Sequence, residues 1–305
     1  MSIELAEKIG SDLVIATDPD ADRCAVAVIM PDGTVELLSG NQIGVLLCDF
    51  IAQNLRSNGR LPQNAAVIST IVSTLMIKKV CADNNIKYFE VLTGFKYIGE
   101  MIAEFEKTGD YTFLLGFEES FGYLKGTYAR DKDSVVAAML ITQMAMFYKN
   151  KHMNLKQAMD ELYKKYGWFA EKTVSFSISG AQPMEQVGRI MKSLRDSNDS
   201  DVAGTDIICL RDYKLRQIRN FCTGEITQTT LPVSDVLYYE LDNGCSVVVR
   251  PSGTEPKVKL YVLTVGDNKF ECNDRINKYL EFFSEKLKYI EKSIHPILLK
   301  IRGCK

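Results

Sequence analysis

The feature that most limits the possible folds is an alternation of strand-like and helix-like segments between Asn41 and Tyr166. Short apolar runs are separated by longer segments whose apolar residues recur every three or four positions. The first helix should end at Asn58-Gly59; further strands are expected at 65–69, 87–92 and 111–115, and further helices at 75–84, 97–107, 134–148 and 155–166. This alternation predicts an α/β domain with a layered, mixed sheet and crossover connections over residues 39–166.

The flanking segments differ from this central region. Residues 1–38 contain the end of a helix and strand patterns at 12–16, 24–30 and 35–38, the last two of which are joined by a turn. This is too little for a domain, and we interpret it as the back part of a domain whose front is missing. Residues 167–305 contain strand patterns at 172–178, 206–210, 236–241, 246–249 and 257–265, with helices at 184–195 and from about 273. They predict an α+β domain with a largely antiparallel sheet.

Composition excludes several classes of protein. The 305 residues carry a formal net charge of −2, so neither a nucleic acid nor an anionic membrane is indicated as a partner. The eight cysteines include no C-x-x-C pair and are typical of buried thiols in a reducing compartment. The N-terminus lacks a signal-peptide pattern, and the longest apolar segment, 135–147, is too short for a membrane span. We therefore expect a cytoplasmic protein.

Three carboxylates stand at alternate positions in Thr17-Asp18-Pro19-Asp20-Ala21-Asp22-Arg23, directly after a predicted strand. Three hard oxygen donors on one short loop suit Mg²⁺, which prefers such ligands and keeps other positions for water or phosphate. An EF-hand is excluded, because its sixth position would be Arg23 and its twelfth Ile29. A solvated acidic turn is the alternative, although charges this close repel one another. Arg23 adds a cation that can orient a phosphate.

A second polar loop, Gly116-Phe-Glu-Glu-Ser-Phe-Gly-Tyr123, follows the predicted strand 111–115. Its carboxylates and hydroxyl can hydrogen-bond vicinal hydroxyl groups of a sugar. Adjacent acids in an extended loop point apart, which argues against a glycosidase pair. A simple strand-to-helix turn remains the alternative for this loop taken alone.

A third loop, Arg250-Pro-Ser-Gly-Thr-Glu-Pro-Lys257, separates two predicted strands. Gly253 allows successive backbone N–H groups to point inward, the hydroxyls of Ser252 and Thr254 add donors, and Arg250 adds a bidentate cation. This pattern predicts a nest for a phosphate monoester, with an ordinary polar turn as the alternative. No Walker A sequence is present.

Other polar residues carry weaker signals. Lys96 opens a helix at another strand end and can contact a substrate or simply be solvated. Lys132 follows the second loop and can reach a sugar phosphate, whereas Asp131 is expected to cap the next helix. The histidines, His152 and His295, lie away from every motif, so a histidine triad or a histidine-ligated metal is not expected.

Taken in order, the three loops resemble the active-site loops of the α-D-phosphohexomutase superfamily, most closely its phosphoglucomutase branch. The likeness runs from Asp12 to about Lys286. It implies that residues 1–38 are the end of domain II with a Mg²⁺ loop, that 39–166 are domain III, and that 167–305 are a TATA-binding-protein-like domain IV. It also implies site roles: metal ligation by Asp18, Asp20 and Asp22; substrate contacts by Arg23, Lys96, Glu118, Ser120 and Lys132; phosphate binding by Arg250, Ser252, Gly253 and Thr254.

One element of the family is not found in these 305 residues. Members carry a Ser-His-Asn-Pro loop whose serine is phosphorylated, and that string is absent here. We therefore expect no catalytic serine in this chain and interpret it as a fragment that lacks the N-terminal domains of the same polypeptide.

The resemblance implies that the parent interconverts glucose 1-phosphate and glucose 6-phosphate through a phosphoserine and a hexose bisphosphate. Hexose phosphate and hexose bisphosphate are the expected ligands, and the isolated chain should be inactive. A phosphomannomutase or phosphopentomutase of the same family, or a non-catalytic phosphosugar-binding protein, remains open.

Overall fold

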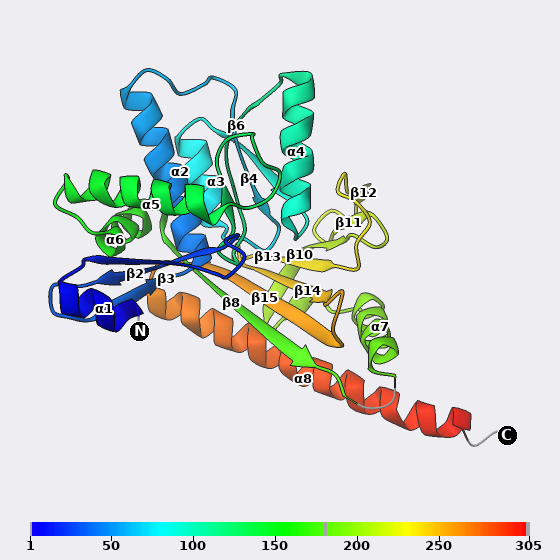
Figure 1. Cartoon of the computed structure of the whole chain (residues 1–305). Coiled ribbons are helices and arrows are strands. Elements are labelled where there is room, and N and C mark those ends of the chain that lie inside the picture. The colour runs from blue at the N-terminus through cyan, green and yellow to red at the C-terminus, as the bar shows by residue number, and fades with distance from the viewer. Residues whose placement is uncertain (1, 180–181, 303–305) are drawn as a thin grey trace. The chain divides into compact units, whose positions relative to one another are not determined.

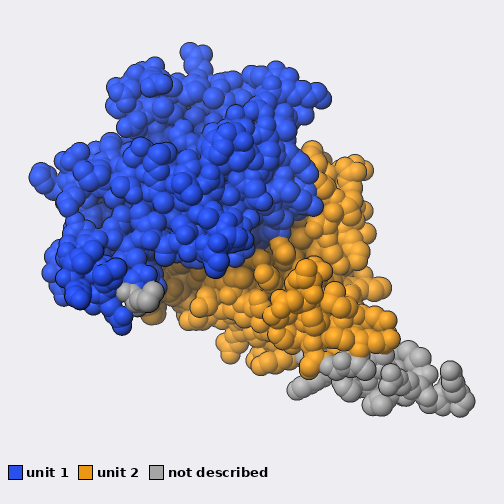
Figure 2. Space-filling view, viewed as in Figure 1, with its two compact units in different colours: residues 1–167 blue, residues 168–305 orange. Residues whose placement is uncertain are grey.

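The computed structural model describes residues 2–179 and 182–302, with side chains in the last helix described up to residue 290. The side chain of His295 lies outside the described side chains, and Cys304 lies outside the described residues. The chain forms two compact units, Met1–Gly167 and Trp168–Lys305, which Figure 2 colours separately. Each unit is described by itself.

The first unit contains a small antiparallel sheet and a larger mixed sheet. Its elements are α1 (Ser2–Ile9), β1 (Leu13–Thr17), β2 (Cys24–Ile29), β3 (Val35–Leu38), α2 (Gly40–Ser57), β4 (Ala65–Thr70), α3 (Met76–Asp83), β5 (Lys87–Val91), α4 (Phe95–Thr108), β6 (Thr112–Phe117), β7 (Tyr123–Leu124), α5 (Ser134–Lys149) and α6 (Leu155–Tyr166). The small sheet has the order β1-β2-β3 and the larger one the order β5-β4-β6-β7.

The larger sheet confirms the predicted α/β layering. Strand β4 pairs in parallel with β5 and with β6, whereas β6 and β7 are antiparallel, so the sheet is mixed. Helix α4 lies on one side of it and α2 and α3 on the other (Figure 1). The α4 side is filled by one apolar cluster, which contains Ile68, Ile98, Ile102, Phe105 and Phe113.

Local capping explains where the helices of this unit begin. Ser39 and Gln42 form a reciprocal capping box at α2, and Asn154 and Gln157 form another at α6. The prediction that Asp131 caps α5 is wrong. Asp133 accepts the backbone N–H groups of residues 135 and 136, because it directly precedes the first helical turn.

The second unit confirms the predicted α+β class with an antiparallel sheet. Its elements are β8 (Trp168–Ser177), α7 (Pro183–Arg195), β9 (Asp201–Val202), β10 (Thr205–Asp212), β11 (Gln217–Asn220), β12 (Ile226–Gln228), β13 (Leu237–Leu241), β14 (Ser246–Pro251), β15 (Lys257–Gly266) and α8 (Lys269–Arg302). The main strand order is β12-β11-β10-β13-β14-β15-β8, with β9 on β10. Helices α7 and α8 pack against the sheet over a core that includes Ile190, Val247, Leu260 and Phe283.

None of the helices in the described part of the chain has both the length and the apolar character that a membrane span needs.

Candidate functional site

The acidic loop forms the tip of the hairpin between β1 and β2, whose end residues Thr17 and Cys24 are paired. It therefore follows an antiparallel strand. The loop winds around Asp18, whose Oδ1 accepts the backbone N–H groups of Asp22 at 3.1 Å and Arg23 at 3.0 Å. The Arg23 N–H is the main reason that the pKa of Asp18 is lowered. A carboxylate that organises its own loop in this way is held in its ionised form.

The three aspartates offer carboxylate oxygens that all lie within 4.8 Å of one another. One oxygen, Oδ1 of Asp22, is buried and accepts no hydrogen bond within the described residues. The Arg23 Nε atom lies 3.7 Å from it and 4.0 Å from Asp18 Oδ2. Buried carboxylate oxygens are nearly always satisfied, and a hard divalent cation bound by oxygen donors would satisfy this one. The donor set therefore fits Mg²⁺.

The Gly-Phe-Glu-Glu-Ser loop makes a tight connection between β6 and β7. The Glu118 N–H donates to the Gly122 carbonyl at 2.9 Å, and Phe121 adopts a left-handed conformation with φ of 68°. Glu118 is only 8% exposed, and its Oε1 accepts the Gly94 N–H at 3.0 Å. Burial raises the pKa of Glu118, and the Gly94 N–H opposes that shift. The neighbouring Ser120 is partly buried.

The acidic loop and this second loop are joined directly. Arg23 and Gly122 form an antiparallel bridge, and the Cys24 N–H donates to the Phe121 carbonyl at 3.0 Å. From the other side, the buried Ser134 donates to the Ala21 carbonyl with both its N–H at 3.1 Å and its hydroxyl at 2.7 Å. Two loops that are 93 or more positions apart in the sequence thus share one hydrogen-bonded framework.

Lys132 is also brought to the acidic loop. Its Nζ lies 2.6 Å from Asp22 Oδ2 and 3.2 Å from Asp131 Oδ1. Burial by itself would lower the pKa of Lys132, but the two carboxylates outweigh that effect and raise it. A side chain at Gly122 would come within 2.7 Å of the Lys132 Cδ atom, so glycine leaves room for the lysine to cross the loop.

Lys96 is not part of this cluster. It lies in the first turn of α4, and its Nζ is 4.7 Å from the centre of the Tyr97 ring. Within the described residues, no hydrogen bond or ion pair joins it to the acidic loop. His152, for which no role was expected, is in the connection between α5 and α6.

The Arg-Pro-Ser-Gly-Thr loop belongs to the second unit, where it joins β14 to β15. Arg250 is still in the sheet, opposite Lys259, and the Ser252 N–H donates to the Lys257 carbonyl at 2.8 Å to close the loop. Ser252 is 8% exposed, whereas Gly253 and Thr254 are exposed. The backbone of Gly253 is not left-handed, and a Cβ there would meet nothing within 4 Å. The fold therefore does not itself require glycine at this position.

Sequence reasoning missed three residues of this framework: Ser134, Gly122 and Gly94. Each acts through its backbone or through a contact with a distant loop. Glycines within a polar loop were the only available signal for two of them, and Ser134 looked like an ordinary first residue of a helix.

Comparison with known proteins places both units in one family. Residues 39–166 match the model described as phosphoglucomutase/phosphomannomutase, alpha/beta/alpha domain III, and residues 213–269 match the C-terminal domain of phosphoglucomutase/phosphomannomutase. Together the two matches cover more than half of the chain.

Individual relatives agree with this. The chain is 33% identical over 276 residues to a phosphoglucomutase of Staphylococcus saprophyticus and 34% identical over 277 residues to one of Staphylococcus aureus, covering 88% and 90% of this chain. In both cases it covers 49% of the relative, so it spans about half the length of the proteins it matches.

Solved structures show the same fold at low sequence identity. Parafusin, a Paramecium phosphoglucomutase in its open form, aligns with a TM-score of 0.61 and 16% identity over 94% of this chain and 48% of its own. A phosphoglucomutase/phosphomannomutase family protein of Burkholderia thailandensis aligns with a TM-score of 0.59 and 15% identity over 95% and 49%. The matched domain models, the relatives and the shared fold lead to one conclusion: this chain belongs to the phosphoglucomutase/phosphomannomutase family.

Proposed function

We propose that this chain supplies the metal, sugar and phosphate loops of a phosphoglucomutase. The whole protein would interconvert glucose 1-phosphate and glucose 6-phosphate through a phosphoserine and a glucose bisphosphate. The observation that carries the proposal is the cluster of Asp18, Asp20 and Asp22, with its unsatisfied buried oxygen, bonded to the Gly-Phe-Glu-Glu-Ser loop. The Staphylococcus relatives, named as phosphoglucomutases, support glucose as the sugar.

In the acidic loop, Asp18, Asp20 and Asp22 would hold Mg²⁺. When bound there, the ion would neutralise negative charge on a transferring phosphoryl group. Asp18 has a second task, because its Oδ1 also holds the loop closed through two backbone N–H groups. Arg23, more than half exposed as a side chain, is free to turn toward a phosphate.

In the second loop, Glu118 and Ser120 would bind sugar hydroxyl groups. The Gly94 N–H holds one Glu118 oxygen and thereby orients the carboxylate. Lys132, which pairs with Asp22 in this structure, would bind a substrate phosphate from the same side. A cation placed between two carboxylates can exchange one of them for a phosphate oxygen. Lys96, at the start of α4, would also contact the substrate.

In the second unit, Arg250, Ser252, Gly253 and Thr254 would grip the phosphate that does not react. The closed turn presents donors on one short loop, and Arg250 offers a planar fork for phosphate oxygens. Glycine at 253 leaves open space for a ligand to approach the backbone.

We further propose that this chain binds phosphosugar but does not turn it over by itself, because these 305 residues contain no Ser-His-Asn-Pro loop. Incubation with glucose 1-phosphate, a catalytic amount of glucose 1,6-bisphosphate and Mg²⁺ should yield no glucose 6-phosphate in a dehydrogenase-coupled assay. Turnover that scales with the amount of chain would overturn this part of the proposal.

The preference of the chain for one sugar phosphate over another is tested by measuring binding affinities. Calorimetric titration with glucose 1-phosphate, mannose 1-phosphate and ribose 1-phosphate should show the tightest binding for the glucose ester. Tighter binding of the mannose or ribose ester would instead support a phosphomannomutase or a phosphopentomutase.

We place the protein in the cytoplasm. The seven cysteines in the described part of the chain are all free thiols, which supports a reducing compartment.

A further inference from the structure

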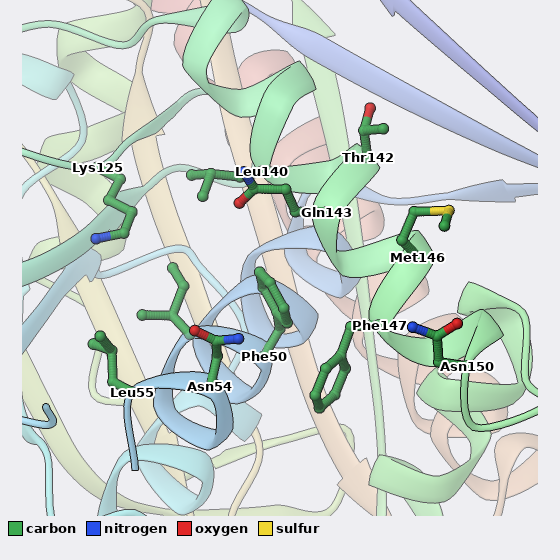
Figure 3. A pocket seen from close by; sticks show the side chains of 11 residues that line it. Phe50, Asn54, Leu55, Lys125, Leu140, Thr142, Gln143, Met146, Phe147 and Asn150 are labelled. Carbon is green, nitrogen blue, oxygen red and sulfur yellow. The ribbon is translucent and has the colours of Figure 1, made fainter. Parts of the chain in front are cut away.

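Helices α2 and α5 of the first unit border a pocket of about 470 Å³ that none of the three proposed loops lines. Figure 3 shows Phe50 and Gln143 between Lys125 and Leu55 on one side and Met146 and Asn150 on the other. The volume lies in the range that is typical of sites for small organic ligands. Most of its wall is apolar and comes from Phe50, Ile51, Leu55, Leu140, Met146 and Phe147.

Lys125 is the charged residue of this pocket. It follows the fully buried Leu124 of β7 and is itself partly buried. Within residues 2–179 and 182–290, its ammonium group makes no hydrogen bond and no ion pair, and no acidic side chain is among the residues that line the pocket. Burial without a partner lowers the pKa of Lys125. Lys132, seven positions later, is in contrast paired with two carboxylates.

A second lysine near the pocket is already engaged. The Lys151 Nζ donates to Gln53 Oε1 at 2.9 Å and lies 4.0 Å from the centre of the Phe147 ring. The pocket therefore has one uncompensated cation next to an apolar wall. A buried or half-buried charge is stabilised by a counter-ion, so the missing partner should be an anion.

The composition of the wall defines what kind of anion fits. Four polar side chains, those of Asn54, Thr142, Gln143 and Asn150, also line the pocket, but most of the wall is hydrocarbon, so a sugar phosphate would leave several hydroxyl groups unpaired. A single lysine matches one negative charge, as on a carboxylate. We propose that this pocket binds a small amphipathic carboxylate, an aliphatic chain whose carboxylate pairs with Lys125. The proposal is independent of the proposed function, because it uses none of the loop residues.

The proposal predicts how affinity depends on chain length. Each methylene that becomes buried should increase the affinity by up to about fourfold, until the pocket is filled. Loss of the charge-assisted contact to Lys125 should reduce the affinity about tenfold or more.

The experiment is a calorimetric titration of the full chain with butanoate, hexanoate, octanoate and decanoate, and with octanol as a neutral comparison. We expect affinity to rise along the series and octanol to bind more weakly than octanoate. Lys125→Met, which keeps the apolar stem, should lower the affinity for octanoate about tenfold or more and leave that for octanol unchanged. Lys107→Met, on the exposed surface of α4, removes the same charge elsewhere and should change neither.

A second variant tests the pocket without removing the charge of Lys125, in case Lys125→Met alters folding. Gln143 lines the pocket and is exposed, so Gln143→Trp should fill the space without disturbing the core, and it should weaken both ligands. Absence of octanoate binding, equal affinity for octanoate and octanol, or octanoate binding that neither variant alters would overturn the proposal.

Discussion

Ser134→Ala is the change that most directly probes how the acidic loop is held. The Ser134 hydroxyl donates to the Ala21 carbonyl at 2.7 Å, and Ser134 is fully buried. Ala21 lies between two of the aspartates and has a left-handed backbone, with φ of 56°. That conformation costs an alanine about 1–2 kcal/mol, so the loop depends on contacts that hold it in place.

The size of the effect follows from the bond that is lost. A hydrogen bond of this kind contributes about 0.5–1.5 kcal/mol net. The Ser134 N–H still donates to the same carbonyl at 3.1 Å, so the acceptor does not become unsatisfied. If the bond favours the loop geometry that binds metal, its loss should weaken Mg²⁺ binding by about two- to twelvefold.

The assay is a Mg²⁺ titration followed by calorimetry, combined with urea unfolding of the metal-free chain. Ser134→Thr retains the hydroxyl and should bind Mg²⁺ more tightly than Ser134→Ala. Ser57→Ala removes a comparable hydroxyl-to-carbonyl bond, at the end of α2, and should leave Mg²⁺ affinity unchanged. If Ser134→Ala loses stability but binds Mg²⁺ normally, Ser134 supports the fold and does not position the metal loop.

Three further changes test other parts of the structure. Tyr148→Phe should lower the free energy of unfolding by about 0.5–1.5 kcal/mol, because Oδ2 of the buried Asp49 loses a hydrogen bond of 3.0 Å but keeps the one from Gln53; Tyr128→Phe, at an exposed site, should have little effect in the same urea titration. Burial raises the pKa of Glu118 above its ordinary 4.5, so its contribution to stability is fully present below pH 4.5 and is lost as pH rises through the folded-state pKa. The stability advantage of Glu118→Gln over the wild type should therefore grow between pH 4 and pH 8, and a difference that does not vary with pH would contradict this. Gly40→Ala should destabilise the chain by about 1–3 kcal/mol in thermal unfolding, because its Cβ would overlap the backbone of the Gly-Phe-Glu-Glu-Ser loop; an unchanged melting temperature would show that this contact is not tight.

The regular elements were predictable wherever a pattern is local. Helix α2 has a capping box at Ser39, and α6 repeats the device at Asn154, so both helices begin within one or two residues of the predicted position. Strand β8 begins at Trp168, four residues earlier than expected. Its first residues pair in register with the end of β15, Leu263–Gly266, and this pairing partner is distant in the sequence.

Short strands at the edge of the second sheet were not predicted. β12 (Ile226–Gln228) is exposed throughout, and β11 (Gln217–Asn220) offers few apolar residues. Neither carries the alternation that indicates a half-buried strand. Their hydrogen bonds to neighbouring strands stabilise them, and no burial pattern marks them in the sequence.

In the candidate site, too, local features were predictable from the sequence and contacts between distant segments were not. The residue types in the acidic loop predicted a cluster of oxygen donors, and the structure places those oxygens together. The contacts that connect the cluster to other loops, through Ser134, Gly122 and Lys132, depend on the folded chain. Residue types alone also led to the wrong helix cap, since Asp131 and Asp133 differ only in their distance from the first turn of α5.

The central claim is that the acidic loop binds Mg²⁺ and that the phosphate loop of the second unit binds a phosphate of a phosphosugar. Calorimetric titration of the chain with glucose 1,6-bisphosphate, in the presence and absence of Mg²⁺, tests it most directly. We predict that Mg²⁺ strengthens binding, that Asp20→Asn abolishes this metal dependence, and that Arg250→Met weakens binding whether or not the metal is present. An affinity for glucose 1,6-bisphosphate that changes neither with Mg²⁺ nor with either substitution would contradict this claim.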